Sequence, residues 1–181
     1  NTEFENKEPE APKYLWQDAS AEALTLEDFL GLSDLYLFNL DKMHQKEQLL
    51  TYSSAFKEYH EESGTVLSVF INSMLLYFVD MDSNGNLNEF AFVVNFTALL
   101  YDEYYFLGRS GYDNLSSNAL VNGITFDYSI GEFYEGINVA AVKCTIDGKQ
   151  YFFRVESFEN MTDINEITLL YFLDTATKQI D

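Results

Sequence analysis

The chain has 181 residues, of which 47% are hydrophobic and 17% aromatic, so it can bury the core of one domain. Its 30 acidic residues outnumber the 10 basic ones, and the formal net charge is −20. A field of that sign repels phosphate backbones and anionic lipid, which argues against nucleic acid or a membrane surface as partner. It favours cations or a basic protein partner, and on the simplest interpretation it only keeps an aromatic-rich domain soluble.

Residues 1–20 form the first segment, an acidic stretch that holds both prolines of the chain. This composition predicts a tether that leads into a single domain over residues 21–181. The chain begins with Asn1 rather than methionine, which indicates a processed or trimmed N-terminus. No hydrophobic stretch in the sequence predicts a signal peptide or a membrane span, so we expect no insertion into a membrane by this chain.

Helical signals dominate residues 25–62. Thr25 is a hydroxyl cap, and the acids Glu27 and Asp28 follow it in the first turn. Further along, apolar residues recur at helical spacing, which predicts one apolar stripe formed by Leu49, Tyr52, Phe56 and Tyr59. The next segment, residues 65–79, is almost wholly apolar, and periodicity alone does not separate a buried helix from a buried strand. We expect a helix to about Ser73 and a strand from Leu75.

Strand patterns dominate the second half, at residues 90–96 and 124–130 and in a final buried strand at residues 166–173. Asp147-Gly148 predicts a two-residue turn of type I′. That turn fixes a register in which residues of one face pair: Cys144 with Tyr151, Val142 with Phe153, and Ala140 with Val155. On the opposite face it pairs Lys143 with Phe152 and Ala141 with Arg154, as suits a more solvated surface.

These elements together predict an α+β fold, in which N-terminal helices pack on an antiparallel β-sheet formed by the second half of the chain. The order of helices followed by long antiparallel strands resembles NTF2-like, cone-shaped domains. That resemblance concerns the fold and carries no function.

Residues 80–89 hold several side-chain oxygens that could bind a metal ion. Side-chain oxygens at Asp80, Asp82 and Asn84 precede Gly85, in a pattern that resembles the calcium loops of EF-hands and dockerins and the DxDxDG loops of secreted bacterial proteins. The resemblance implies that these three side chains would bind calcium and that Asn86 would supply its carbonyl oxygen. The chain departs from the EF-hand pattern afterwards, because the closing position holds Ala91 and the carboxylate of Glu89 comes two residues earlier.

The alternative interpretation is an ordinary β-hairpin with Asn84-Gly85 as a two-residue turn. It pairs Val79 with Phe90 and places Asp80 directly opposite Glu89, with Asp82 on the same face. Like charges in direct opposition repel one another unless water or a cation screens them. Both interpretations therefore leave an acidic site at residues 80–89, where a weakly bound calcium ion would act as a structural cofactor.

Three functions agree with these patterns. The first is a non-catalytic acidic domain of a secreted or surface-attached bacterial protein, with calcium at the hairpin tip. The second is an intracellular, cytoplasmic inhibitor or immunity-type protein that binds a basic partner. The third is an NTF2-like domain that binds a small ligand or catalyses a reaction. The sequence singles out no catalytic residue. The one cysteine, Cys144, falls on the predicted core face, which argues against a role as nucleophile.

Overall fold

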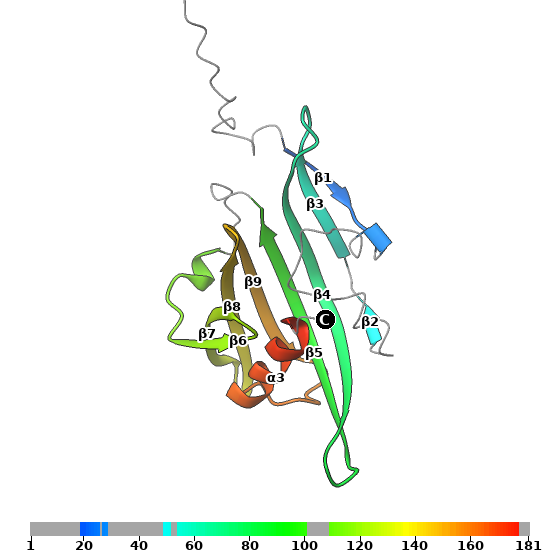
Figure 1. The fold of residues 1–181 in the computed structure, drawn as a ribbon, viewed down its shortest axis with the longest axis vertical. Helices are drawn as coiled ribbons and strands as arrows, with labels where there is room; N and C mark the ends of the chain where they lie inside the picture. The colour runs from blue at the N-terminus through cyan, green and yellow to red at the C-terminus, as the bar shows by residue number, and fades with distance from the viewer. Residues whose placement is uncertain (1–18, 26, 29–48, 52–53, 101–108, 178–181) are drawn as a thin grey trace, which may run out of the picture.

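The structure, a computed structural model, describes residues 19–25, 27–28, 49–51, 54–100 and 109–177. The strands are β1 (Ala19–Ala23), β2 (Leu49–Thr51), β3 (Ser54–His60), β4 (Val66–Met81), β5 (Leu87–Leu99), β6 (Ser117–Val121), β7 (Ile124–Tyr134), β8 (Ile137–Ile146) and β9 (Lys149–Ser157). They form a nine-stranded sheet in the order β1-β3-β4-β5-β9-β8-β7-β6, and β2 also pairs with β4 (Figure 1). Every pairing is antiparallel. The described helices are the short 3-10 helix η2 (Arg109–Tyr112) and the α-helix α3 (Glu166–Thr177).

The predicted α+β fold, with N-terminal helices packed on a sheet from the second half, is wrong. β2 and β3 occupy part of the segment that was expected to be helical, and both pair with β4. Phe56 of the predicted apolar stripe is 38% exposed, so the helical spacing marks no buried face. Strand pairing here overrides a weak local preference. The structure does show the cap at Thr25, whose Oγ1 accepts a hydrogen bond from the Asp28 backbone at 3.1 Å. Residues 1–18 of the tether expected over residues 1–20, and residues 29–48 of the expected helix, lie outside the described residues, while Ala19 and Ser20 begin β1.

The helix predicted up to Ser73 is also wrong, because β4 is one strand of 16 residues. A β-bulge interrupts the pairing of this strand near Ser73. Pairing with β5 shifts between Ile71 and Met74, and Ser73 has a φ of 52°. The Asn95 side chain stabilises this bulge, because its Oδ1 accepts a hydrogen bond from the Ser73 backbone at 2.8 Å.

The predicted strands at 90–96 and 124–130 are confirmed as parts of β5 and β7. The predicted β8–β9 hairpin is confirmed with its register, from Cys144 opposite Tyr151 to Ala140 opposite Val155. Asp147 and Gly148 have φ angles of 50° and 78°, as both central positions of a type I′ turn require.

The strand predicted at residues 166–173 is wrong, because this segment begins α3. Asn165 caps the helix: its Oδ1 accepts from the Thr168 backbone at 3.0 Å, and its own N–H donates to Thr168 Oγ1 at 3.0 Å. The buried helix residues recur at helical spacing: Leu169, Phe172, Leu173 and Ala176. The local signals therefore favour a helix once the capping pair is recognised.

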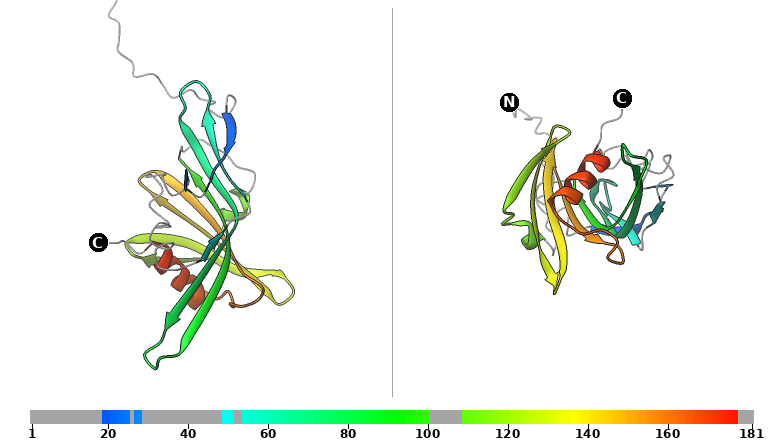
Figure 2. Two further views of the ribbon diagram at one scale, coloured as in Figure 1. Left: turned by 90° about the vertical axis from the view of Figure 1, so that its right-hand side faces the viewer. Right: turned by 90° about the horizontal axis from the view of Figure 1, so that it is seen from below.

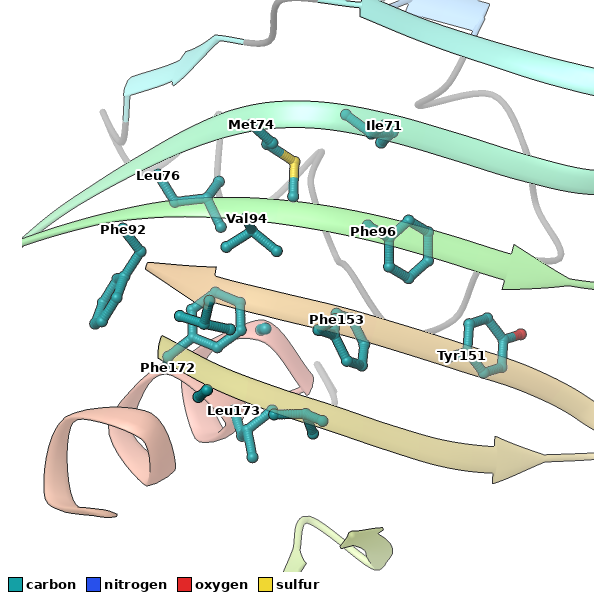
Figure 3. Close-up of a cluster of buried hydrophobic side chains, with 14 of the residues drawn as sticks. Ile71, Met74, Leu76, Phe92, Val94, Phe96, Tyr151, Phe153, Phe172 and Leu173 are labelled. Carbon is teal, nitrogen blue, oxygen red and sulfur yellow. The ribbon is translucent and has the colours of Figure 1, made fainter. Parts of the chain in front are cut away.

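The core lies between α3 and the concave face of the twisted sheet (Figure 2). Phe172 is fully buried, and its ring centroid lies 5.3 Å from that of Phe92 on β5. Figure 3 shows this contact beside a row of buried side chains from β4, β5 and β9. We call the opposite side of β7, β8 and β9, which α3 does not cover, the outer face. It presents the residues that alternate with the core positions, among them Asp127, Lys143 and Arg154.

Candidate functional site

The predicted calcium loop is the tip of the β4–β5 hairpin, which projects beyond the rest of the sheet (Figures 1 and 2). Gly85 donates its backbone N–H to Asp82 O at 3.1 Å, and Asp82 donates its own to Asn86 O at 2.9 Å. Gly85 has a φ of 82°, in the left-handed region. This is a loop of the type I turn plus bulge kind, with residues 83–85 between the closing pair, and not a two-residue turn.

The longer loop shifts the strand register by one position. Val79 pairs with Glu89 and position 80 pairs with Asn88, so the predicted pairs Val79–Phe90 and Asp80–Glu89 are wrong. Side chains alternate along a strand, and a slip of one residue exchanges the two faces. Glu89 therefore shares a face with Val79 and not with position 80.

The Asp82 carboxylate accepts three hydrogen bonds from within the loop. Its Oδ1 accepts from the backbone of Asn84 and of Asn86, each at 2.9 Å, and its Oδ2 accepts from Asn86 Nδ2 at 3.2 Å. The hydrogen bond from the Asn86 backbone is the main reason that the pKa of Asp82 lies below its usual value. A carboxylate offers about four lone-pair sites on its two oxygens, and these hydrogen bonds take three of them.

The structure thus brings together three of the five predicted ligands, Asp82, Asn84 and Asn86, through hydrogen bonds within the loop. Glu89 instead accepts a hydrogen bond from the Tyr77 hydroxyl, which together with burial raises the pKa of Tyr77. Of Asp80 only the backbone pairing is described. Among the residues that the structure describes, no group of three or more His, Cys, Asp or Glu side chains is placed to hold a metal ion.

A second candidate lies where the β7–β8 hairpin meets the connection from β9 to α3. We call the exposed apolar and acidic side chains of these two segments together the aromatic–acidic surface: Phe133, Tyr134, Ile137, Met161, Glu132, Glu135, Glu159 and Asp163. Phe133 is 55% exposed and Tyr134 66%, while Met161 is 47% exposed. A hydrogen bond of 3.3 Å from Asn138 Nδ2 to Ile164 O joins the two segments.

The guanidinium group of Arg154 lies beside this surface. The Arg154 guanidinium carbon lies 4.1 Å from the centroid of the Phe133 ring, and Arg154 Nε donates to Glu156 Oε1 at 2.9 Å. The Phe133 ring therefore already takes part in a cation–π contact, supported by a carboxylate. Sequence reasoning missed the surface, although the adjacent aromatic pair Phe133-Tyr134 marks it. The strand pairing shifts between Glu132 and Tyr134, and the two exposed rings pack edge to face with their centroids 4.7 Å apart.

A third candidate is a hollow of about 370 Å³ on the outer face. Its polar lining comes from three strands and from the end of η2, with Asp113, Asp127, Lys143 and Gln150. Its apolar wall is formed by Tyr112 and Phe152, whose ring centroids lie 5.1 Å apart in an edge-to-face arrangement. Burial raises the pKa of Tyr112, and the positive charge of Arg154 partly opposes that shift.

Cys144 borders the same hollow and is 5% exposed, which confirms the predicted core position. Burial, with a smaller contribution from the Asp127 charge, raises the pKa of its thiol to about 12. Because the thiolate is the nucleophile in cysteine chemistry, this thiol stays protonated and unreactive near neutral pH.

Within the described part of the chain, none of the helices has the length and apolar character needed to cross a membrane. No family model, no curated protein and no solved structure matches this chain. Its function must therefore be argued from the surfaces described above.

Proposed function

We propose that this chain is a non-catalytic acidic domain that binds a basic protein partner through the aromatic–acidic surface. One observation carries the proposal: large apolar side chains stand exposed there among carboxylates, with Tyr134 at 66% and Phe133 at 55% exposure. This exposure supports the expectation of a basic partner, which was based on net charge alone, and we propose this surface as the place where such a partner binds.

The composition of this surface suits recognition better than it suits solubility. Exposed aromatic rings cost free energy in water, and aromatic residues are enriched at protein–protein interfaces and among their energetic hot spots. The four carboxylates around the rings are all exposed, so they are available to lysine or arginine side chains of a partner. Rings and carboxylates together offer a cation both of the contacts it favours.

The contacts of Arg154 with a ring and a carboxylate are the arrangement that we propose for an arginine of the partner. Arg154 stacks on Phe133 and at the same time forms an ion pair with Glu156. Tyr134 and Glu135 offer the same combination of ring and carboxylate next to it, and both are exposed. We therefore propose that an arginine of the partner stacks on Tyr134 while Glu135 or Glu132 pairs with its guanidinium group.

The net charge of −20 would act at longer range. It raises the encounter rate with any basic protein, and this steering falls as salt is added. Local recognition by rings is much less sensitive to salt. Calcium has no part in this proposal, which rests on the rings and carboxylates of the aromatic–acidic surface. The same surface would serve a domain displayed outside the cell and, as the alternative, a cytoplasmic inhibitor.

The test uses a fluorescently labelled oligoarginine peptide, whose binding is followed by anisotropy at about 150 mM salt, where the Debye length is near 8 Å. Tyr134→Ser and Phe133→Ser keep the charge and remove the rings. Leu120→Ser is the matched control, because Leu120 is 73% exposed on β6, away from the aromatic–acidic surface. We expect each ring variant to weaken binding by about fivefold to thirtyfold, as for the loss of an interface hot-spot contact of 1–2 kcal/mol. The Leu120 variant should bind like the wild type.

A second pair of variants separates local charge from total charge. Glu132→Gln with Glu135→Gln removes two charges inside the surface, whereas Glu61→Gln with Glu62→Gln removes two exposed charges at the turn between β3 and β4. Figure 1 shows that turn at the far end of β4 from the β4–β5 tip. Equal losses for both pairs, with no effect of the ring variants, would show that the peptide senses only net charge and would refute the proposal.

A further inference from the structure

The hollow on the outer face places opposite charges on neighbouring strands. Asp127 on β7 pairs directly with Lys143 on β8 in the strand register. Both side chains line the hollow, and both are half-buried. Within the described residues the salt bridges are Lys57–Glu22 and Arg154–Glu156, so Asp127 and Lys143 lie opposite one another without forming a direct salt bridge there. Their charges are available to a ligand.

The other residues that line the hollow add a carboxylate, an apolar wall and a neutral amide. Asp113, just after η2, adds a second carboxylate, and Tyr112 and Phe152 form the apolar wall. Gln150 contributes a neutral amide that can donate and accept hydrogen bonds. A volume of about 370 Å³ falls at the lower end of the range for pockets that bind small molecules.

These charges select the class of ligand. A simple anion would meet Lys143 but would be repelled by the two carboxylates and by the net charge of −20. A simple cation would be attracted by the carboxylates but would leave Lys143 without a partner. A molecule with an ammonium and a carboxylate group, separated by a short apolar body, meets all three charges at once.

We propose that this hollow binds a small organic zwitterion of the size of an amino acid. Its ammonium group lies between Asp127 and Asp113, its carboxylate contacts Lys143, and its apolar body packs on the wall formed by Tyr112 and Phe152. The site goes beyond the proposed partner-binding function, since none of these residues belongs to the aromatic–acidic surface.

The test uses three matched probes: phenylalanine, phenethylamine without the carboxylate, and 3-phenylpropionate without the ammonium group. Binding to the full chain is measured by calorimetry and by amide chemical shifts. The probe concentration is raised to about 10 mM, so that a dissociation constant in the millimolar range, about −4 kcal/mol of binding free energy, is still detected. Asp127→Asn and Lys143→Gln remove one charge each on the outer face. Asp147→Asn is the control, because Asp147 is an exposed acid in the β8–β9 turn, and asparagine tolerates its positive φ of 50°.

We expect phenylalanine to bind at one site with shifts centred on residues 112–113, 127 and 143, at least tenfold more tightly than either half-probe. Asp127→Asn and Lys143→Gln should each weaken it by tenfold or more, and Asp147→Asn should not. The absence of saturable binding by phenylalanine would overturn the proposal. So would phenethylamine binding as tightly as phenylalanine, with no effect of Lys143→Gln, because that result indicates only attraction of a cation to an acidic protein. Unfolding midpoints of the variants confirm that each one folds.

Discussion

Replacing Phe172 by alanine should remove the main anchor that holds α3 on the sheet. The Phe172 side chain is 0% exposed, and its ring lies 5.3 Å from the Phe92 ring on β5. A Phe→Ala change at a fully buried site costs about 3–5 kcal/mol, from lost transfer free energy and from the cavity that remains. This is a large part of the total stability of a domain, about 5–15 kcal/mol.

The assay is equilibrium unfolding in urea, followed by far-UV ellipticity, with the free energy of unfolding extrapolated to water. Ile167→Ala supplies the control on the same helix, because Ile167 is 81% exposed. Exposed substitutions of this kind usually stay within about 0.5 kcal/mol. If Phe172→Ala cost no more than Ile167→Ala, the docking of α3 on the concave face of the sheet would be refuted.

Three further predictions concern the calcium hypothesis and the buried thiol. Millimolar calcium should leave the melting temperature unchanged, because three of the four lone-pair sites of the Asp82 carboxylate already accept hydrogen bonds within the loop. An upward shift that Asp82→Asn abolishes would restore the calcium site, since calcium adds about 0.4 kcal/mol at a concentration equal to Kd and about 2.7 kcal/mol at a hundredfold excess. Cys144 should resist an aromatic disulfide reagent at pH 8 until the protein unfolds, and complete labelling of the native protein within seconds would contradict its burial. Because folding raises the pKa of this thiol from 9.0 to about 12, its stabilising contribution is complete below pH 9 and is lost as the pH rises towards 12. Cys144→Ala should therefore lose less stability than the wild type over that interval, which urea unfolding at each pH will measure.

The two hairpins show how far a turn dipeptide predicts a register. Asp147-Gly148 was sufficient, because both residues adopt the left-handed conformation that a type I′ turn requires. Asn84-Gly85 was not, because the Asp82 carboxylate binds the backbone N–H groups of Asn84 and Asn86 and stabilises a longer loop. Such bonds between a side chain and nearby backbone compete with the pattern that the dipeptide alone favours.

The helical and strand assignments failed for different physical reasons. Residues 54–60 have helical spacing but become an inner strand, and the pairing with β4 that decides this is a long-range contact. At residues 166–173 the apolar run is ambiguous by periodicity, and the deciding signal is the reciprocal hydrogen bonding of Asn165 and Thr168. That second signal was readable from the sequence.

The candidate surfaces were less predictable than the strands. The net charge indicated a basic partner but gave it no location, because acidic residues are spread along the whole sequence. The hollow joins Asp113 and Asp127 with Lys143 and Gln150, and only the strand order and the position of η2 bring them together.

Binding of a basic partner to the aromatic–acidic surface can be tested by mapping amide chemical shifts during titration with the oligoarginine peptide. We expect the largest shifts in residues 132–137 and 159–163, and we expect Tyr134→Ser to reduce them while Leu120→Ser does not. Shifts spread evenly over exposed acids, including Glu61 and Glu62, would contradict this proposal.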